Sequence, residues 1–310
     1  MSTRFQAPPG TLDWLPERSV VRRHALEAAR RLFEAAGYRE WHVPVFEDIQ
    51  LFARTAGASS DVVRKEMYDF VDKGDRHLAL RPEFTAGLCR AYVEHGLKQR
   101  PQPVKIWAAG SVYRYNRMQK GRYREFVQFD AEAVGTADPA VDAELIALGV
   151  RWLESLGVRG LEVLVNSLGD PETRAAYRPA LQAFLDARRD ELHPEVYALR
   201  DTNPLRAFDT KHAPSQAVLE AAPRLSEHLS EAARRHFAAV CAFLDARGIR
   251  YAVDPSLVRG LDYYTHTAWE VVWPELGAQS TLLGGGRYDG LIAEIGGDPT
   301  PGVGFAAGID

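Results

Sequence analysis

The chain has 310 residues, 46% of them hydrophobic and 26% charged, which suits one large or two modest domains with a sizeable core. Its 38 basic and 42 acidic residues give a formal net charge of -4 at pH 7, so any contact with RNA must be local. Two distant cysteines, Cys89 and Cys241, predict neither a disulfide framework nor a cysteine-bound metal. The sequence has no signal core and no apolar run of roughly 18 residues, so we expect a cytoplasmic protein without membrane contact.

The first predicted elements are a helix, an interrupted strand and a strand–helix pair. Apolar residues at helical spacing predict a helix over 18–36, which a glycine ends. Residues 38–46 predict a strand that Pro44 confines to an edge or an interface, because proline lacks a backbone donor. A short strand near Leu78 and a helix over 85–94 follow.

The middle of the sequence predicts a long hairpin with a charged tip. Its two strands cover 104–109 and 126–134, and the polar segment 116–123 joins them. A helix over 140–156 and a buried strand over 161–166 follow.

Between residues 171 and 244 the sequence is rich in Ala, Arg, Glu and Leu and is broken by prolines, which predicts a mostly helical insertion. Strand-like segments resume at 251–253, 266–273 and 279–283. We therefore expect three parts, namely a first core segment over 1–170, the insertion over 171–244 and a second core segment over 245–310.

Cationic side chains gather at the hairpin tip, and polar side chains follow on the return strand. The cations are Arg114, Arg117, Lys120, Arg122 and Arg124. On the return strand, period-two alternation places Gln128, Asp130 and Glu132 on one face of the sheet. Guanidinium groups suit phosphate oxygens and deep carboxylates suit an amine or an imidazole, so this face predicts a site for a nucleotide and a cationic ligand. The alternative is a solvent-facing hairpin laced with ion pairs.

Two further runs are candidates for the same site. Glu83 and Thr85 stand where a predicted strand meets a helix, and the alternative is that they only cap this helix. Arg259 opens the run Arg-Gly-Leu-Asp-Tyr-Tyr-Thr, in which an arginine, an acid and two tyrosines share a short segment. The later glycine run at 284–286 predicts either a close backbone approach or a tight hairpin turn.

Several common kinds of site are excluded. The glycine run lacks the Gly-Lys-Ser/Thr ending of a phosphate loop and the spacing of a Rossmann fingerprint. No His-Glu-x-x-His or Cys-x-x-Cys pair occurs, so we expect no protein-bound catalytic metal. A divalent ion is expected only with the phosphates of a nucleotide.

Taken together, these segments resemble the catalytic core of a class II aminoacyl-tRNA synthetase, and specifically the histidyl-tRNA synthetase family. Residues 37–54 resemble the dimer-forming motif 1, and residues 113–132 resemble motif 2. The runs that begin at Arg259 and Gly284 resemble the two histidine-specific motifs. The resemblance implies an α+β fold, in which an antiparallel sheet is flanked by helices and interrupted by a mostly helical insertion, and it implies a homodimer.

The resemblance also implies the roles of individual side chains. The histidine-binding residues would be Glu83, Thr85, Gln128, Glu132, Tyr263 and Tyr264. The ATP-binding residues would be Arg114, Arg122, Arg124 and Arg259. Arg114 and Arg259 would be the catalytic pair at the α-phosphate, where two arginines offset the repulsion between a carboxylate and a phosphate.

The activity implied is that of a histidine–tRNA ligase. Histidine would react with ATP, whose phosphates carry Mg²⁺, to give histidyl-adenylate, and histidine would then pass to tRNA(His). The alternative is a regulatory subunit of ATP phosphoribosyltransferase, which keeps the fold and senses histidine without charging tRNA. Four arginines of the insertion either follow the tRNA acceptor stem or belong to solvated helices, namely Arg188, Arg189, Arg234 and Arg235.

The sequence departs from the family pattern in three places. Asn116 and Met118 replace residues that are often glutamate and proline in the motif 2 loop, and Val127 stands where bacterial members often have histidine. Residues 302–310 resemble the start of motif 3 but stop before its ATP-binding arginine. We therefore expect either a catalytic fragment of a synthetase, without its anticodon-binding domain, or a shortened paralogue.

Overall fold

The described residues of the computed structural model are 5–55, 57, 60, 62–117 and 121–310. Met118 and Lys120, which the sequence places at the hairpin tip, lie outside them. Within the described part of the chain, no helix has the length and apolar character that crossing a bilayer requires.

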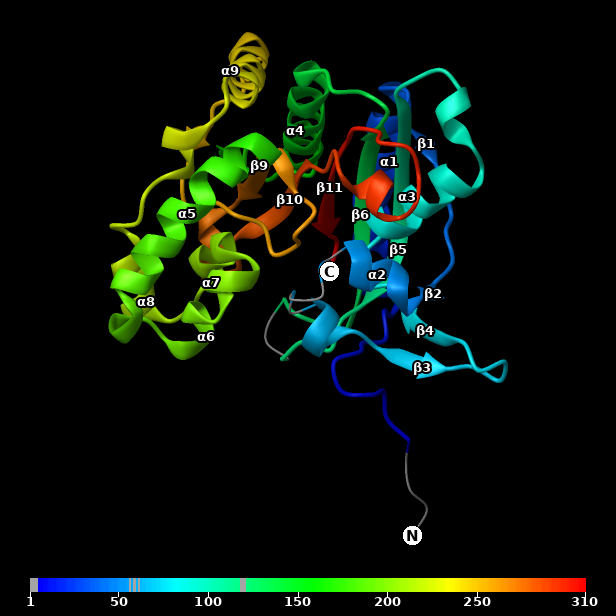
Figure 1. Ribbon diagram of the computed structural model, residues 1–310. Coiled ribbons are helices and arrows are strands. Elements are labelled where there is room, and N and C mark those ends of the chain that lie inside the picture. Colours follow the sequence, from blue (N-terminus) through cyan, green and yellow to red (C-terminus); the bar gives the residue numbers. More distant parts are fainter. Residues whose placement is uncertain (1–4, 56, 58–59, 61, 118–120) are drawn as a thin grey trace.

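One large sheet forms the centre of the protein (Figure 1). In order across the sheet, its strands are β1 (Arg39–Glu40), β5 (Val104–Tyr113), β6 (Glu125–Val134), β11 (Gly302–Gly308), β10 (Thr281–Arg287), β9 (Thr265–Val272), β7 (Glu162–Ser167) and β8 (Ala252–Val253). The strands from β5 to β7 pair antiparallel, whereas the short edge strands β1 and β8 pair parallel with their neighbours. The predicted antiparallel sheet of an α+β fold is therefore confirmed.

A small sheet lies beside the large one and contains β2 (Phe46–Asp48), β4 (His77–Leu80) and β3 (Asp69–Val71). The single strand predicted over 38–46 is wrong, because the chain leaves the large sheet after β1 and joins the small sheet at β2. Pro44 lies in this crossover, where its missing N–H costs neither sheet a hydrogen bond. The helix α2 (Ile49–Thr55) and a π-helical turn (Val62–Glu66) follow β2.

Three long helices cover one face of the large sheet, namely α1 (Pro16–Ala35), α4 (Pro139–Ser155) and α9 (Glu231–Ala246). The helix α4 begins where Asp138 accepts a hydrogen bond from the backbone N–H of Ala140 at 2.9 Å. Its Trp152 packs on Phe129 of β6, with ring centroids 5.1 Å apart. Alternation along β6 therefore sends its apolar side chains into this core and its polar ones to the opposite face.

The opposite face is only partly covered. The helices α3 (Thr85–Glu94) and α10 (Leu291–Glu294) pack on it through an apolar cluster that includes Cys89, Tyr92, Leu291 and Ile292. The helix predicted over 85–94 matches α3. Beyond α3 the sheet face carries the polar side chains of β6.

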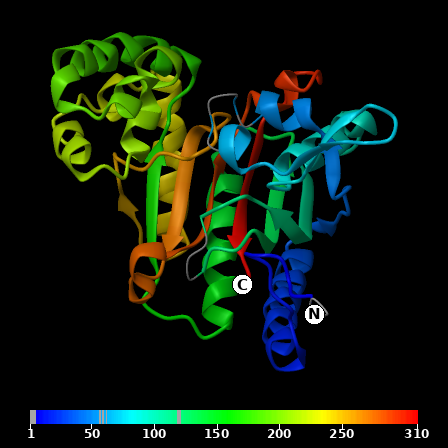
Figure 2. The same cartoon turned by 90° about the horizontal axis from the view of Figure 1, so that it is seen from below.

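The insertion has a core of its own and lies at one side of the sheet, where Figure 2 shows its helices in green and yellow. Its helices are α5 (Pro171–Ala187), α6 (Pro194–Tyr197), α7 (Leu199–Thr202) and α8 (Ala213–Leu219). Helix α9, although it begins before residue 244, packs Val240 and Leu244 into the core of the large sheet. The division of the chain at 170 and 244 stays a prediction. Short 3₁₀ turns lie at Leu97–Gln99, Arg189–Glu191, Pro204–Asp209, Leu225–His228 and Pro274–Gln279.

Candidate active site

A row of polar side chains crosses the open sheet face at β6. Gln128, Asp130 and Glu132 are all buried there. Of their six register partners on the neighbouring strands, only Ile106 is larger than alanine, so the backbone on either side leaves room above the row. The remaining partners are Ala108, Gly110, Gly304, Ala306 and Gly308.

A pocket of about 310 Å³, which we call the polar pocket, opens above this row. It brings together segments that are far apart in the sequence, and it includes most of the predicted site. The predicted residues that line it are Glu83, Thr85, Arg114, Gln128, Arg259, Tyr263 and Tyr264. The other lining residues include Asp130, Gly260, Thr281, Gly284 and Gly308.

Glu132 lies beneath the pocket rather than in its wall. Thr85 Oγ1 donates to one carboxylate oxygen of Glu132 at 2.6 Å, and the Tyr288 hydroxyl donates to the other at 2.6 Å. Burial raises the pKa of Glu132 to about 8, although both hydrogen bonds oppose this shift. The backbone of Gly304 makes room for this carboxylate, since a methyl group there would lie 1.5 Å from it.

Glu83 caps helix α3, which is one of the two roles that the sequence suggested for its position, and its role in ligand binding stays a prediction. Its Oε1 accepts a hydrogen bond from the Ala86 N–H at 2.9 Å, which caps α3. Its Oε2 is buried and has no hydrogen-bond partner among the described residues. Burial raises its pKa, and its charge is partly offset by Arg114. The cap therefore holds a carboxylate whose second oxygen is left for a ligand.

Arg114 joins this pocket to a second one. Its Nε donates to the Pro82 carbonyl at 2.8 Å, and its guanidinium lies 5.5 Å from the centre of the Phe126 ring. The second pocket, of about 260 Å³, shares Arg114 and Gly308 with the first. Its other lining residues are Glu66, Asn116, Gly121, Arg122, Tyr123, Phe126 and Asp310.

Arg122 and Arg124 differ in position, although both were predicted to bind ATP. Arg122 lines the second pocket. Arg124 is not among the described residues that line either pocket. Its guanidinium lies 3.8 Å from the centre of the Tyr115 ring, and its side chain packs against Gly10. The structure therefore brings Arg122, but not Arg124, to the pockets.

Arg259 lines the same pocket as Arg114. It forms an ion pair with Glu270 of β9, a residue that the sequence did not single out. The other oxygen of Glu270 accepts a hydrogen bond from Thr281 Oγ1 at 2.8 Å. Gly284 leaves space for the guanidinium, because a methyl group there would lie 2.6 Å from its nitrogens. Glu270 and Gly284 thus fix where the Arg259 guanidinium lies.

The glycine run at 284–286 lies within β10 and not in a turn. A side chain at Gly285 would meet the Gly304 carbonyl oxygen at 2.2 Å, and one at Gly286 would meet the Tyr264 ring at 2.6 Å. The tight hairpin turn, one of the two readings of this run, is therefore wrong. The close backbone approach is correct, and it seats the Tyr264 ring beside the pocket.

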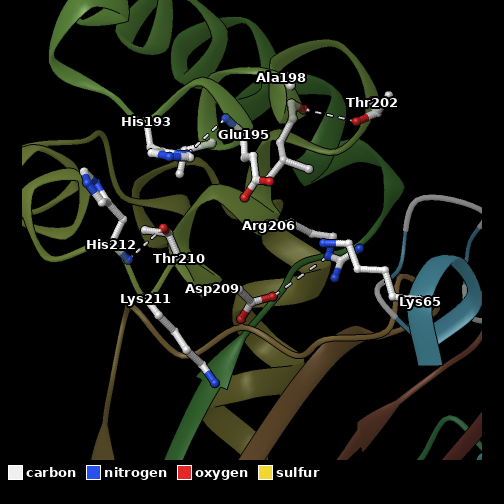
Figure 3. A pocket seen from close by; sticks show the side chains of 12 residues that line it. Lys65, His193, Glu195, Ala198, Thr202, Arg206, Asp209, Thr210, Lys211 and His212 are labelled. Carbon is white, nitrogen blue, oxygen red and sulfur yellow. Dashed lines mark hydrogen bonds and ion pairs between the residues drawn. The ribbon is translucent and has the colours of Figure 1, made fainter. Parts of the chain in front are cut away.

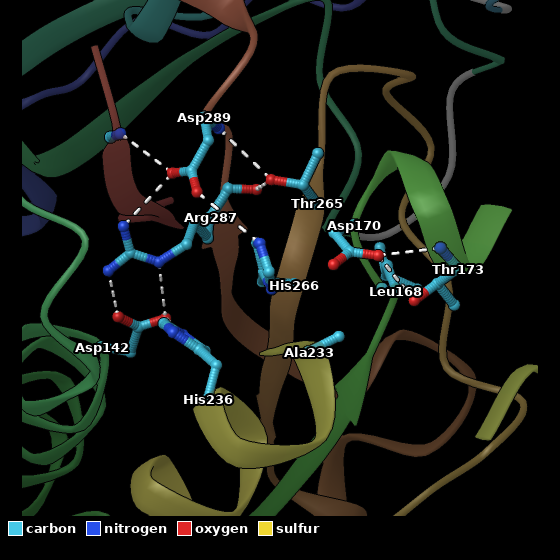
Figure 4. A network of polar contacts seen from close by, with 12 residues as sticks. Asp142, Leu168, Asp170, Thr173, Ala233, His236, Thr265, His266, Arg287 and Asp289 are labelled. Atoms are coloured by element: carbon cyan, nitrogen blue, oxygen red, sulfur yellow. Dashed lines mark hydrogen bonds and ion pairs between the residues drawn. The ribbon is translucent and has the colours of Figure 1, made fainter. Parts of the chain in front are cut away.

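A second polar network lies at the end of β10 (Figure 4). Arg287 is fully buried, and it pairs with the fully buried Asp142 of α4. His236 of α9 approaches Asp142 at 3.3 Å, and its ring centroid lies 4.9 Å from that of His266. The network joins β9, β10, α4 and α9 behind the site, and no local sequence pattern had indicated it.

A cavity of about 630 Å³ lies mainly in the insertion and shares no lining residue with the polar pocket (Figure 3). Its cationic side chains are Lys65, Arg206 and Lys211, and Figure 3 shows Lys65 reaching it from outside the insertion. His193 and His212 also line it, with ring centroids 4.9 Å apart. Among the described residues no group of three or more His, Cys, Asp or Glu side chains is placed to hold a metal ion.

The antiparallel sheet is flanked by helices and carries the polar pocket above β6 on its open face. This is the catalytic fold of a class II aminoacyl-tRNA synthetase. A family model described as Histidyl-tRNA synthetase matches residues 10–310. The chain belongs to this family.

Two curated relatives show the extent of the similarity. The "Histidine--tRNA ligase" of Rubrobacter xylanophilus is 49% identical over 315 residues, which cover 99% of this chain and 74% of the relative. The protein of the same name from Rhodospirillum rubrum is 50% identical over 307 residues, with the same two coverages. This chain therefore spans about three quarters of the length of these relatives.

Solved structures agree with this assignment. The apo histidyl-tRNA synthetase of S. aureus superimposes with a TM-score of 0.82 at 37% identity and covers 99% of this chain and 72% of its own. A structure titled as an ATP phosphoribosyltransferase regulatory subunit/histidyl-tRNA synthetase from Bacillus halodurans has a TM-score of 0.74 at 23% identity, with coverages of 100% and 83%. The second likeness shows the fold alone, so the regulatory alternative has less support than the ligase.

Proposed function

We propose that this chain activates histidine with ATP and transfers it to tRNA(His), as a cytoplasmic histidine–tRNA ligase catalytic domain. One observation carries the proposal, namely that acidic acceptors and two arginines of distant segments line one pocket. The names of the relatives support the substrate assignment. The reaction proceeds through histidyl-adenylate and pyrophosphate, without a covalent enzyme intermediate.

The histidine end of the pocket is built from Glu83, Gln128, Glu132 and the two tyrosines. Glu83 and Gln128 offer buried acceptors to the α-ammonium group. Glu132 and Tyr264 hydrogen-bond the imidazole, with Tyr263 packed against Tyr264 at a ring-centroid distance of 4.5 Å. Thr85 holds the Glu132 carboxylate in position. This arrangement selects an amino acid whose side chain has its own hydrogen-bonding nitrogens.

The ATP end lies between Arg114 and Arg259. Attack of the histidine carboxylate on the α-phosphate brings two anions together, and two guanidinium groups offset this repulsion as charge spreads over the phosphate oxygens. Arg122 in the second pocket suits the remaining phosphates. Mg²⁺ is expected to arrive with the phosphates of ATP.

The insertion is the proposed contact for the tRNA. Its surface arginines are occupied by neighbouring acids, since Arg188 pairs with Glu191 at 3.0 Å and Arg234 pairs with Glu231 at 3.4 Å. This pairing favours the solvated-helix interpretation of the predicted arginines. The insertion cavity is lined by Lys65, Arg206 and Lys211 and also by Glu195 and Asp209, and Arg206 pairs with Asp209 at 4.0 Å, so its charge is mixed. It is a second candidate surface for the acceptor end.

The proposed homodimer uses the small sheet and the segment that resembles motif 1. Phe46 of β2 is 52% exposed and Phe70 of β3 is 39% exposed. Phe70 of β3 stacks edge-on against Phe46 at a ring-centroid distance of 6.3 Å. An apolar strand face that is this exposed suits burial against a second copy.

Histidine-dependent exchange between ATP and labelled pyrophosphate tests the proposed activity. We expect exchange with histidine and none with the other amino acids. Binding of histidine without exchange would instead support the regulatory function, and exchange driven by another amino acid would refute the substrate assignment.

Sedimentation of wild type and Phe46→Asp tests the dimer, which the charged residue should dissociate.

A further inference from the structure

Asp130 occupies the middle of the polar row and has no role in the site described so far. Its side chain is fully buried, yet it lines the polar pocket. Neither of its carboxylate oxygens has a hydrogen-bond partner among the described residues. A buried carboxyl without a partner is costly, so its position calls for a group that enters the pocket.

The charged neighbours of Asp130 leave its oxygens available. Glu83 and Glu132 are like charges, while Arg81 and Arg114 are the facing cations. The Arg81 guanidinium donates to the Ser111 and Val43 carbonyls, both at 2.9 Å, and Arg114 Nε donates to a carbonyl as well. Burial and the two neighbouring carboxylates raise the pKa of Asp130 well above its ordinary value.

Three buried acceptors without partners line the same pocket, namely Glu83 Oε2, Gln128 Oε1 and the carboxyl of Asp130. An ammonium group has three N–H donors. Thr85, which the family resemblance names as a histidine-binding residue, donates its hydroxyl proton to Glu132. The acceptor set therefore matches an ammonium group when Asp130 is included.

We propose that Asp130 is a substrate-binding residue that accepts a hydrogen bond from the α-ammonium group of the amino acid. This inference deepens the proposed function and rests on it. Asp130 contributes to affinity for the α-ammonium group and not to selection of the imidazole.

Binding of three ligands distinguishes a hydrogen bond between Asp130 and the α-ammonium group from a purely structural role of Asp130. Histidine and histidinol carry the amine, whereas imidazolepropionic acid has the same ring and carboxylate without it. Asp130→Asn keeps the shape of the side chain and removes its negative charge. We expect this variant to weaken binding of histidine and of histidinol by about 10- to 100-fold, which is the range for a hydrogen bond between charged groups. Binding of imidazolepropionic acid should change by less than about twofold. Asp298→Asn, at an exposed surface pair with Lys98, is the matched control and should behave as wild type.

Titration calorimetry with the three ligands measures these affinities for wild type and variant. The proposal fails if the variant binds histidine with unchanged affinity, or if it loses affinity equally for imidazolepropionic acid. Wild-type pyrophosphate exchange separates this from a failure of the proposed function, because exchange with histidine can persist when the Asp130 assignment is wrong.

Discussion

Arg287 and Asp142 form an ion pair in which both side chains are fully buried. The guanidinium also donates to the Thr136 carbonyl at 2.7 Å and to Asp289 at 3.2 Å, so its charge is well satisfied. The pair connects the end of β10, which carries the glycine run, to helix α4 on the opposite face of the sheet. It thereby fixes the strand that seats both Arg259 and Tyr264.

Removal of one partner of this pair should destabilise the protein strongly. We expect Asp142→Ala to lower the free energy of unfolding by about 3–5 kcal/mol, because it removes the fully buried partner of Arg287 and leaves only the partly exposed Asp289 as counter-ion. Urea unfolding measures the loss. Glu191→Ala breaks a pair with Arg188 in which both side chains are about half exposed, and it should cost under about 1 kcal/mol. Equal losses for the two variants would contradict the expectation.

Glu132 should make stability depend on pH. Its pKa is about 8 in the folded protein against an ordinary 4.5, so at pH values between these the unfolded chain binds fewer protons. The free energy of unfolding therefore falls as the pH rises from 4.5 to about 8, and this contribution is then constant. Glu132→Gln should flatten the fall between pH 5.5 and pH 8.5 in urea unfolding. Parallel pH profiles for wild type and variant would show that Glu132 does not titrate as expected.

Gly304→Ala should displace the Glu132 carboxylate beneath the polar pocket. The added methyl group would lie 1.5 Å from the Glu132 carboxylate and 2.7 Å from the Ala131 carbonyl, and neither the buried carboxylate nor the backbone can move freely. We expect a loss of about 1–3 kcal/mol in unfolding free energy together with weaker histidine binding. Gly290→Ala is the control, since its methyl group would meet nothing closer than 3.8 Å. A fully stable Gly304→Ala protein with normal histidine affinity would refute the packing argument.

Arg259 should act on the reaction rather than on histidine binding. Arg259→Ala should lower the rate of pyrophosphate exchange by about 100-fold or more while the dissociation constant of histidine stays close to wild type. Glu270→Gln, which keeps an acceptor for Thr281 but loses the charge, should lower kcat by about tenfold without raising KM for histidine. Unchanged exchange in Arg259→Ala would remove this residue from its proposed place at the α-phosphate.

The elements with strong local signals could be predicted from the sequence. The helix over 85–94 matches α3, and the helix over 140–156 differs from α4 by one residue at each end, because periodicity and capping are encoded within each segment. The prediction of one strand over 38–46 was wrong, because this segment contributes to two sheets whose other strands lie elsewhere in the sequence.

The same limit applies to the site. Period-two alternation correctly placed Gln128, Asp130 and Glu132 on one face, since this depends on a single strand. Glu270 gave only a weak signal in the sequence, as an acid within an apolar strand. Its ion pair with Arg259 could be recognised only in the structure. The spacing of the arginines also could not show that Arg122 lines a pocket whereas Arg124 packs on Tyr115, because the direction of each side chain is set by tertiary packing.

The place of β11 in the sheet has a consequence for how the chain folds. This strand comes after β6 and β10 in the sequence, yet it lies between them and pairs with both. Until residues 302–308 are synthesised, β6 and β10 each keep an unpaired edge, and the polar row of β6 lacks its neighbour. Such long-range pairing is slow to form and exposes strand edges to aggregation. The nascent chain is therefore most in need of protection by a chaperone just before β11 emerges from the ribosome.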